Sequence, residues 1–188
     1  MVPPRGCLMR QYYWWLFSSA TSAFVATAAL AAQTMTANDV MRNIGLKAGQ
    51  WHTSIRVTGA EAASSSPGRE LPERVRSELQ KMIGTSVETD DCIGTSGGAN
   101  GALILPGISI AGDCVLSDVH ATTRDLALDS VCGKADDGFR ARMKVKAILS
   151  DATMNATVQV STRSEGVGVV TNLTLSTASK YVGSCRLR

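Results

Sequence analysis

Hydrophobic and polar residues alternate along several stretches of this chain. From residue 139 to 147 every second residue is apolar, and the four residues between them are all basic. Residues 51–57 and 156–161 repeat the same two-residue period, and a further strand is expected near Val169–Ser176. A period of two is typical of β-strands with one buried face. We therefore predict antiparallel strands over these ranges, each with one solvated side.

One stretch has the spacing of a helix instead. After Pro72, apolar residues recur at Val75, Leu79 and Met82, with charged residues on the other sides. This spacing places the three side chains on one face, and proline is favoured at a first helical position. The pattern predicts one amphipathic helix of about three turns that ends near Gly84.

The remaining segments read as connections. Thr34–Gly45 is predicted to be a polar lead with one helical turn capped by Asn38. Ala60–Arg69 is small and polar and is predicted to be a loop. Ala102–Ile110 is apolar but contains Pro-Gly, so we expect a buried or edge segment rather than a central strand. The fold predicted is mainly β: an antiparallel meander that forms a curved sheet or a small barrel, with one short amphipathic helix.

The first 32 residues have the order of a secretory signal peptide. Arg5 and Arg10 precede an uncharged stretch, which ends in the small residues Ala29-Leu30-Ala31-Ala32. Basic, apolar and small-residue regions in this order predict export, with cleavage after Ala31 or Ala32. Translation from Met9 would leave a complete signal, and a retained membrane anchor is the alternative. Residues 33–188 would then form a single periplasmic domain.

Composition excludes several classes of function for this domain. Without Arg5 and Arg10 the 19 basic residues become 17, against 16 acidic ones, so a general nucleic-acid or polybasic membrane role is disfavoured. Its aromatic residues are Trp51, Phe139 and Tyr181. The core must therefore come from smaller aliphatic side chains, which bury less area each, and disulfides would supplement it.

Four cysteines lie after the leader, at positions 92, 114, 132 and 185. Residues 114–132 resemble a hairpin; with its centre at Thr123, Cys114 faces Cys132 at a distance that a disulfide spans. Cys92 would then pair with Cys185. A zinc site is disfavoured because no close C-x-x-C pair exists. We predict two disulfides and no metal or cofactor.

The alternating basic residues of the strand at 139–147 are candidate binding groups. Such a row could contact anionic lipid head groups, polyanionic sugars or another protein. The structural alternative is cross-strand pairing: with a turn at 133–138, Asp129 faces Arg142, Asp125 faces Lys146 and Leu128 faces Met143. This row, called the basic stripe below, comprises Arg140, Arg142, Lys144 and Lys146.

One pair of residues is a candidate catalytic site. Asp118 and His120 share a predicted strand face and could act as a base and its orienting group, with a hydroxyl from a distant loop such as Ser96. No G-x-S-x-G nucleophile motif is present. The glycine-rich loop at 94–101 lacks the lysine and hydroxyl residue of a phosphate-binding loop, which disfavours nucleotide binding. With only two histidines, His52 and His120, a transition-metal site is disfavoured as well.

The chain carries a set of landmarks in a fixed order. They are the signal segment, Leu46-Lys47-Ala48-Gly49-Gln50-Trp51, Cys92-Ile93, Cys114, Cys132, Ser150-Asp151 and Gly183-Ser184-Cys185. Taken in order, and over a range from about Leu46 to Cys185, these landmarks resemble the exported bacterial family known as domain of unknown function 3617. The resemblance implies an exported, disulfide-bonded β fold, and it implies no catalytic residues.

These observations favour a non-catalytic periplasmic protein that binds an apolar or amphiphilic ligand or an envelope component. A barrel-like interior could hold such a ligand, or could be filled by side chains. Two alternatives stay open: a hydrolase that uses Asp118 and His120, and a protein-interaction module that uses the basic stripe. The interior is expected to be formed by Trp51, Met143, Val145, Val158 and Val160.

Overall fold

The computed structural model describes residues 35–66, 68–133, 138–164, 166 and 168–185. The predicted signal segment, residues 1–32, lies outside these residues, as does most of the predicted turn at 133–138. Export and cleavage therefore stay predictions.

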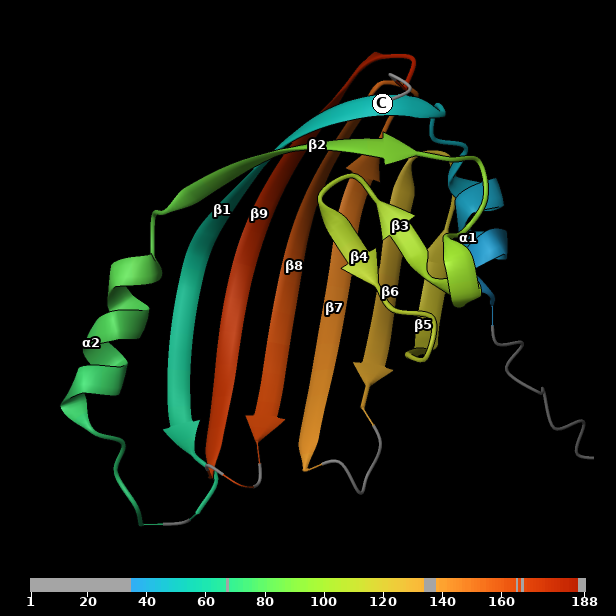
Figure 1. Cartoon of the computed structure of the whole chain (residues 1–188). Helices are drawn as coiled ribbons and strands as arrows, with labels where there is room; N and C mark the ends of the chain where they lie inside the picture. Colours follow the sequence, from blue (N-terminus) through green and yellow to red (C-terminus); the bar gives the residue numbers. More distant parts are fainter. Residues whose placement is uncertain (1–34, 67, 134–137, 165, 167, 186–188) are drawn as a thin grey trace, which may run out of the picture. The chain divides into compact units, whose positions relative to one another are not determined.

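Seven antiparallel strands form one curved sheet in the order β2-β1-β9-β8-β7-β6-β5 (Figure 1). The outermost strands β2 and β5 do not pair with each other, so the sheet is open and is not a barrel. The predicted mainly β, antiparallel curved sheet is confirmed. The strands are β1 (Gly49–Ser64), β2 (Ser86–Ile93), β5 (Val115–Ala121), β6 (Asp125–Cys132), β7 (Phe139–Leu149), β8 (Thr153–Ser164) and β9 (Val169–Gly183).

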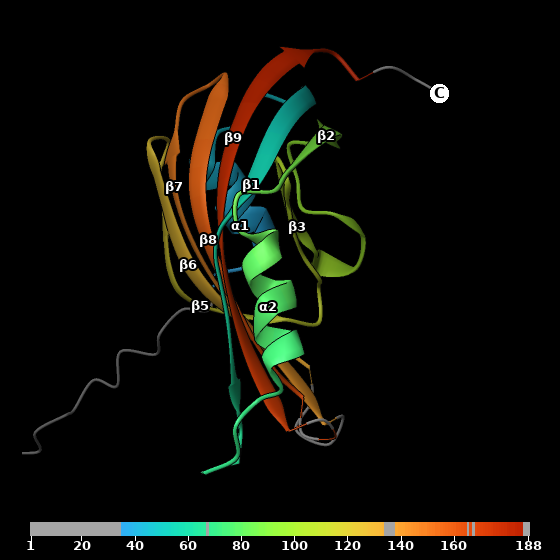
Figure 2. The same cartoon turned by 90° about the vertical axis from the view of Figure 1, so that its left-hand side faces the viewer.

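A second, two-stranded sheet covers part of the large one. It is a hairpin of β3 (Leu103–Leu105) and β4 (Ile108–Ile110), turned at Pro106-Gly107. Figure 2 shows this hairpin on the same, concave side of the sheet as helix α1 (Ala37–Ile44). Leu103, Leu105, Ile108 and Ile110 of its strands are buried, in agreement with the buried segment predicted at 102–110. A 3₁₀ turn, η1 (Ala99–Gly101), precedes it.

The described residues contain two α-helices where the sequence pattern predicted one. The predicted amphipathic helix is confirmed as α2 (Glu73–Met82), with Pro72 at its N-cap and Gly84 just past its end. The second helix, α1, replaces the single turn expected at 34–45. Its cap is Thr36 and not Asn38, because Thr36 and Asp39 bond each other's backbone N–H groups in a capping box.

Two strands are longer than predicted, and one strand was not predicted. β1 continues through the predicted loop to Ser64, because Ala60 and Ala62 pair with β9 after a bulge at Val57–Gly59. The strand β2 was not predicted, because its residues are mostly acidic or polar rather than alternating with apolar ones. β9 continues to Gly183, past the end that was predicted near Ser176.

The pairing between β6 and β7 is shifted by two residues from the predicted register. Asp129 lies opposite Lys144, Asp125 opposite Ile148, and Leu128 opposite Val145. A shift of two keeps every side chain on its predicted face but changes its partner. Of the predicted acid–base pairs neither forms, and Lys144 takes Asp129 instead.

Disulfides join Cys92 to Cys185 and Cys114 to Cys132, the same pairs that the sequence favours. The β5–β6 hairpin has the expected register at its cysteine end, where Val115 faces Val131. Nearer the turn a β-bulge shifts the pairing between Ser117 and His120. Asp118 is inside this bulge and has a left-handed backbone, with φ 49°.

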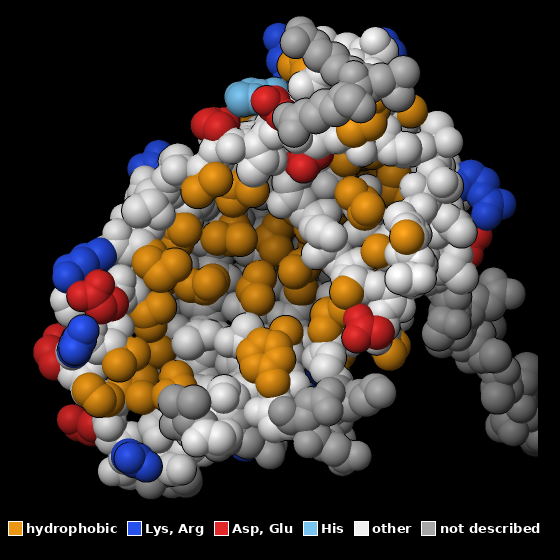
Figure 3. All heavy atoms as spheres, in the orientation of Figure 1, with side chains coloured by type: hydrophobic (Ala, Val, Ile, Leu, Met, Phe, Trp, Pro, Cys, Tyr) orange, Lys and Arg blue, Asp and Glu red, His pale blue; other side chains and the backbone are white. Residues whose placement is uncertain are grey.

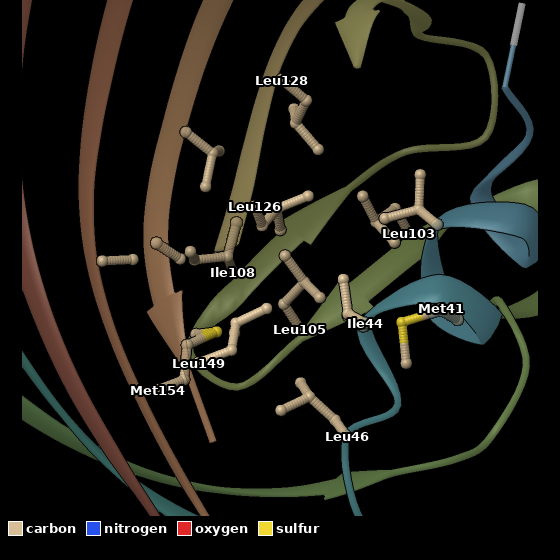
Figure 4. Packing of buried hydrophobic residues seen from close by; sticks show 14 of the residues in the cluster. Met41, Ile44, Leu46, Leu103, Leu105, Ile108, Leu126, Leu128, Leu149 and Met154 are labelled. Atoms are coloured by element: carbon tan, nitrogen blue, oxygen red, sulfur yellow. The ribbon is translucent and has the colours of Figure 1, made fainter. Parts of the chain in front are cut away.

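The hydrophobic core lies between the hairpin, α1 and the upper part of the sheet. Figure 4 shows Met41 and Ile44 of α1 and Leu105 and Ile108 of the hairpin pointing toward the sheet. The sheet residues that face them, Leu126 among them, are almost fully buried. The hairpin and α1 thus fill one end of the concave side and leave the other end uncovered.

Candidate functional site

The concave face of the sheet continues beyond the part that the hairpin covers. Paired residues of neighbouring strands form rows across this face. The row through Thr53, Ser179 and Met154 is fully buried. Two rows farther along, Val57 and Leu175 are only half-buried, and so are Leu173, Val160 and Met143 in the row after that.

Figure 3 shows hydrophobic side chains gathered in a hollow between α2 and the hairpin. We call this surface the apolar groove. Its floor is aliphatic and uncharged in the rows that follow the covered end. The groove residues are Val57, Ala62, Ala141, Met143, Val160, Leu173 and Leu175.

Helix α2 forms one side of this groove. It packs along β1, and beyond Arg56 that strand has no β2 partner. Backbone hydrogen bonds hold its C-terminal end, from Gly84 N–H to Val57 O at 2.8 Å and from Val57 N–H to Thr85 O at 3.0 Å. None of its residues is buried, and Val75 and Leu79 are half-exposed. The helix therefore presents apolar side chains that the protein itself does not fully cover.

A polar clasp fixes the hairpin at the closed end of the groove. One oxygen of the Asp91 carboxylate accepts hydrogen bonds from Gly107 N–H and from Thr89 Oγ1, both at 2.9 Å. Thr53 Oγ1 donates to Ser179 Oγ at 2.9 Å, and that hydroxyl lies 3.5 Å from Pro106 O. These bonds hold the hairpin turn against β1, β2 and β9, so they fix the position of the hairpin at the closed end of the groove.

The five residues expected to form the interior divide between the two ends. Trp51 is fully buried, donates from Nε1 to Lys47 O and packs edge-on against Tyr181. Val145 and Val158 are buried at the border, while Met143 and Val160 lie in the groove. The interior is thus filled at one end and open at the other.

Sequence reasoning missed Leu173 and Leu175 of β9 and the part played by α2. The alternation in β9 was a usable signal, since leucines at 173 and 175 share one strand face. The role of α2 had no such signal, because its position beside the groove depends on tertiary packing.

The basic stripe lies on the opposite, solvent-exposed face of β7. All four of its side chains are exposed. Lys144 forms an ion pair with Asp129 at 3.2 Å, and among the described residues no acidic group lies within 4.0 Å of the other three. Cross-strand pairing therefore accounts for one of the four cations.

Asp118, His120 and Ser96 are not brought together. All three are among the described residues, and no hydrogen bond or ion pair joins any two of them. The bulge at Asp118 interrupts the alternation that would place it on one face with His120. The described residues thus show no hydrogen bond that would orient Asp118 and His120 as a catalytic pair.

His52 lies on the outer face and bridges two strands. Its Nδ1 is 2.9 Å from Asp90 Oδ1, and its Nε2 is 3.2 Å from Glu88 Oε2. The hydrogen bond with Asp90, aided by both negative charges, raises the pKa of this imidazole above 6.5. Within the described ranges, no cluster of three or more His, Cys, Asp or Glu residues could hold a metal ion.

Two buried hydroxyls have no hydrogen-bond partner among the described residues. They are Ser130 Oγ and Thr177 Oγ1, on the concave face of β6 and β9. A separate cavity of about 620 Å³ lies beside the end of α1, lined by Arg124, Asp125 and Asp151 among others. Its charged lining differs from that of the apolar groove, and no candidate residue of the sequence analysis lines it.

Comparison with known proteins gives one family. Residues 46–185 match the family model described as "Protein of unknown function (DUF3617)". Nothing matches the chain among curated proteins or among solved structures. Among the described residues, no helix has the length and apolarity needed to cross a membrane.

Proposed function

The chain belongs to the DUF3617 family of proteins of unknown function, and we propose that it is an exported, non-catalytic protein that binds the aliphatic part of an amphiphile in the apolar groove. One observation carries this proposal: the concave face is filled at one end and uncovered at the other. Contiguous exposed apolar surface in a soluble domain marks a binding site for an apolar partner.

The groove lining favours an aliphatic ligand over an aromatic or charged one. Its floor residues are valine, leucine, methionine and alanine, and Thr162 and Thr171 add only hydroxyl groups in the row of Ala62 and Ala141. Phe139, at the far end of β7, is the one aromatic side chain on the described part of this face beyond the covered end. Such a surface offers dispersion contacts and no partner for a buried charge.

Two features support export. The disulfides Cys92–Cys185 and Cys114–Cys132 are of the kind that persist in oxidising compartments. The first 32 residues have the pattern of a cleaved signal. The check is mass spectrometry of the protein recovered from the periplasm. A chain that begins at Ala32 or Gln33 would agree with export and cleavage, and a full-length chain in the cytoplasm would contradict both.

Binding is tested with parinaric acid, a polyene fatty acid whose fluorescence rises in apolar surroundings. Leu173→Trp places a large side chain on the groove floor and should weaken probe binding at least tenfold. Asn172→Trp is the matched control, because Asn172 is the preceding residue and lies exposed on the other face. The control should bind like the wild-type protein.

The length of the fatty-acid chain gives a second test of binding in the groove. Each methylene that enters the groove contributes up to about 0.8 kcal/mol, close to a fourfold gain in affinity. Saturated fatty acids of increasing length should therefore displace the probe progressively better. Equal displacement by all lengths, or equal binding by the two tryptophan variants, would contradict the proposal.

A further inference from the structure

The open end of the apolar groove carries an exposed aromatic residue. Phe139 begins β7 on the same face as Met143 and Val145, and it lies opposite Ser164 of β8. Its side chain is 48% exposed. An amphiphile that leaves or enters at this end of the groove therefore meets Phe139.

Three arginines lie at the same end of the sheet, on its outer face. Arg140 is the direct cross-strand partner of Arg163, and Arg142 follows two residues along β7. Facing residues are about 5 Å apart at Cβ, and alternate residues of a strand are about 6.6 Å apart. All three side chains are exposed, and among the described residues none is in an ion pair with an acid.

This arrangement favours an anionic partner. Like charges directly opposite each other on neighbouring strands destabilise a sheet. A phosphate group between Arg140 and Arg163 would remove that repulsion and accept guanidinium hydrogen bonds. Lys144 differs because Asp129 already neutralises it.

We propose that this end of the sheet docks on an anionic lipid bilayer, with Phe139 entering the interface and Arg140, Arg142 and Arg163 contacting lipid phosphates. We call these four residues the docking edge. The inference rests on the proposed function, since it names the surface from which the groove takes its amphiphile. A bilayer offers an apolar layer directly beneath its charges, which matches an aromatic beside arginines. A soluble polyanion would use the arginines and leave Phe139 without a partner.

The test measures co-sedimentation of the mature chain with vesicles at low ionic strength. Vesicles of phosphatidylcholine containing phosphatidylglycerol should bind the wild-type protein, and pure phosphatidylcholine vesicles should bind it poorly. Each arginine near the surface adds about fivefold in affinity, so the triple change Arg140→Gln, Arg142→Gln, Arg163→Gln should lose about a hundredfold. Arg56→Gln, Arg124→Gln, Lys180→Gln removes the same charge from exposed sites elsewhere and should lose much less.

A second variant reports on insertion. In Phe139→Trp the new indole should shift its emission to shorter wavelength when anionic vesicles are added, while buried Trp51 stays constant. Phe139→Ser should bind the vesicles more weakly than the wild-type protein.

Equal losses in the two triple variants, or no emission shift, would overturn the docking proposal. It would also be overturned if dextran sulfate bound the protein through these arginines while anionic vesicles did not. Parinaric acid binding is measured on the same proteins without vesicles. If the protein binds parinaric acid but does not bind anionic vesicles, only the docking inference is refuted. If the wild-type protein does not bind parinaric acid, the proposed function itself is refuted.

Discussion

Individual polar residues decide where the apolar groove ends. Thr53 and Ser179 are buried on the concave face and bond each other beneath the hairpin turn, and Asp91 holds Gly107 from the other side. Thr177 lies between Ser179 and Leu175 on the same face of β9, yet its hydroxyl has no partner among the described residues. Buried hydroxyls of similar position thus differ in whether they stabilise the fold.

This difference predicts opposite outcomes for two threonine-to-valine changes. Thr53→Val leaves Ser179 Oγ without its donor and should lower the free energy of unfolding by about 1 kcal/mol. Thr177→Val exchanges an unpaired hydroxyl for a methyl of the same shape, so stability should stay equal or rise. Urea unfolding midpoints measure both. A larger loss for Thr177→Val than for Thr53→Val would show that the Thr177 hydroxyl has a partner.

His52 should make the attachment of β2 depend on pH. Its pKa is raised in the folded protein by the hydrogen bond with Asp90 and by the charges of Asp90 and Glu88. A raised pKa means that the folded state binds the proton more tightly than the unfolded chain does. The stabilisation is therefore full below the unfolded pKa of about 6.5 and is lost as pH rises through the folded pKa.

The measurement is the thermal unfolding midpoint of the wild-type protein and of His52→Gln, taken from mild acid to alkaline pH. The difference between the two midpoints should be largest in mild acid and should shrink toward alkaline pH. A difference that is constant with pH would mean that the imidazole binds its proton equally tightly in the folded and unfolded states, which contradicts a raised pKa.

At the scale of elements, the β3–β4 hairpin separates the filled part of the concave face from the open part. Its turn lies close against β1: a Cβ atom at Gly107 would be 2.5 Å from Thr53 Cγ2, and the glycine has φ 71°. Both conditions favour glycine: the close approach leaves no room for a side chain, and the backbone conformation is one that other residues rarely adopt.

Helix α2 contrasts with the buried hairpin, since it lies beside the groove and has no buried residue.

Gly107→Ala should therefore lower the free energy of unfolding more than a Gly→Ala change at a position where the added Cβ meets no other atom. Gly84 also has a left-handed backbone, with φ 88°, but no atom lies within 4 Å of an added Cβ. Gly84→Ala should cost about 1 kcal/mol through backbone strain, and Gly107→Ala about 2–4 kcal/mol because the hairpin must also move. Urea denaturation of both variants tests this. Equal costs would show that the turn moves away from Thr53 freely.

At the scale of the whole molecule, two disulfides tie distant parts of a domain with few aromatic residues. Cys92–Cys185 joins residues 93 positions apart, at the end of β2 and just after β9. Cys114–Cys132 joins residues 18 positions apart, at the open ends of the β5–β6 hairpin. The longer closure restricts the unfolded chain more.

Removal of the Cys92–Cys185 disulfide should destabilise the protein more than removal of Cys114–Cys132. The chain-entropy model gives about 4.6 kcal/mol for Cys92–Cys185 and about 3.2 kcal/mol for Cys114–Cys132. The paired changes Cys92→Ser with Cys185→Ser, and Cys114→Ser with Cys132→Ser, should follow this order in urea unfolding. The reverse order would indicate that packing around the shorter bridge outweighs the entropy of the unfolded chain.

Local sequence patterns were enough to predict the class of this fold and the faces of its strands. The alternation in 139–147 and 156–161 predicted which side chains of β7 and β8 lie on the concave face, because successive residues of a strand point to opposite sides. The spacing of Val75, Leu79 and Met82 predicted α2 for the same kind of reason. These are local properties, and local backbone geometry is sufficient to set them.

Long-range packing set which strands meet, in which register they pair, and how much of the concave face stays open. The two-residue shift between β6 and β7 gave Lys144 the partner Asp129 and placed Val145 opposite Leu128. Both registers pair similar residues, so the sequence pattern does not distinguish them. The open groove depends on where the hairpin, α1 and α2 come to rest on the sheet. That position follows from long-range packing and from bonds such as Asp91–Gly107, which no short sequence window contains.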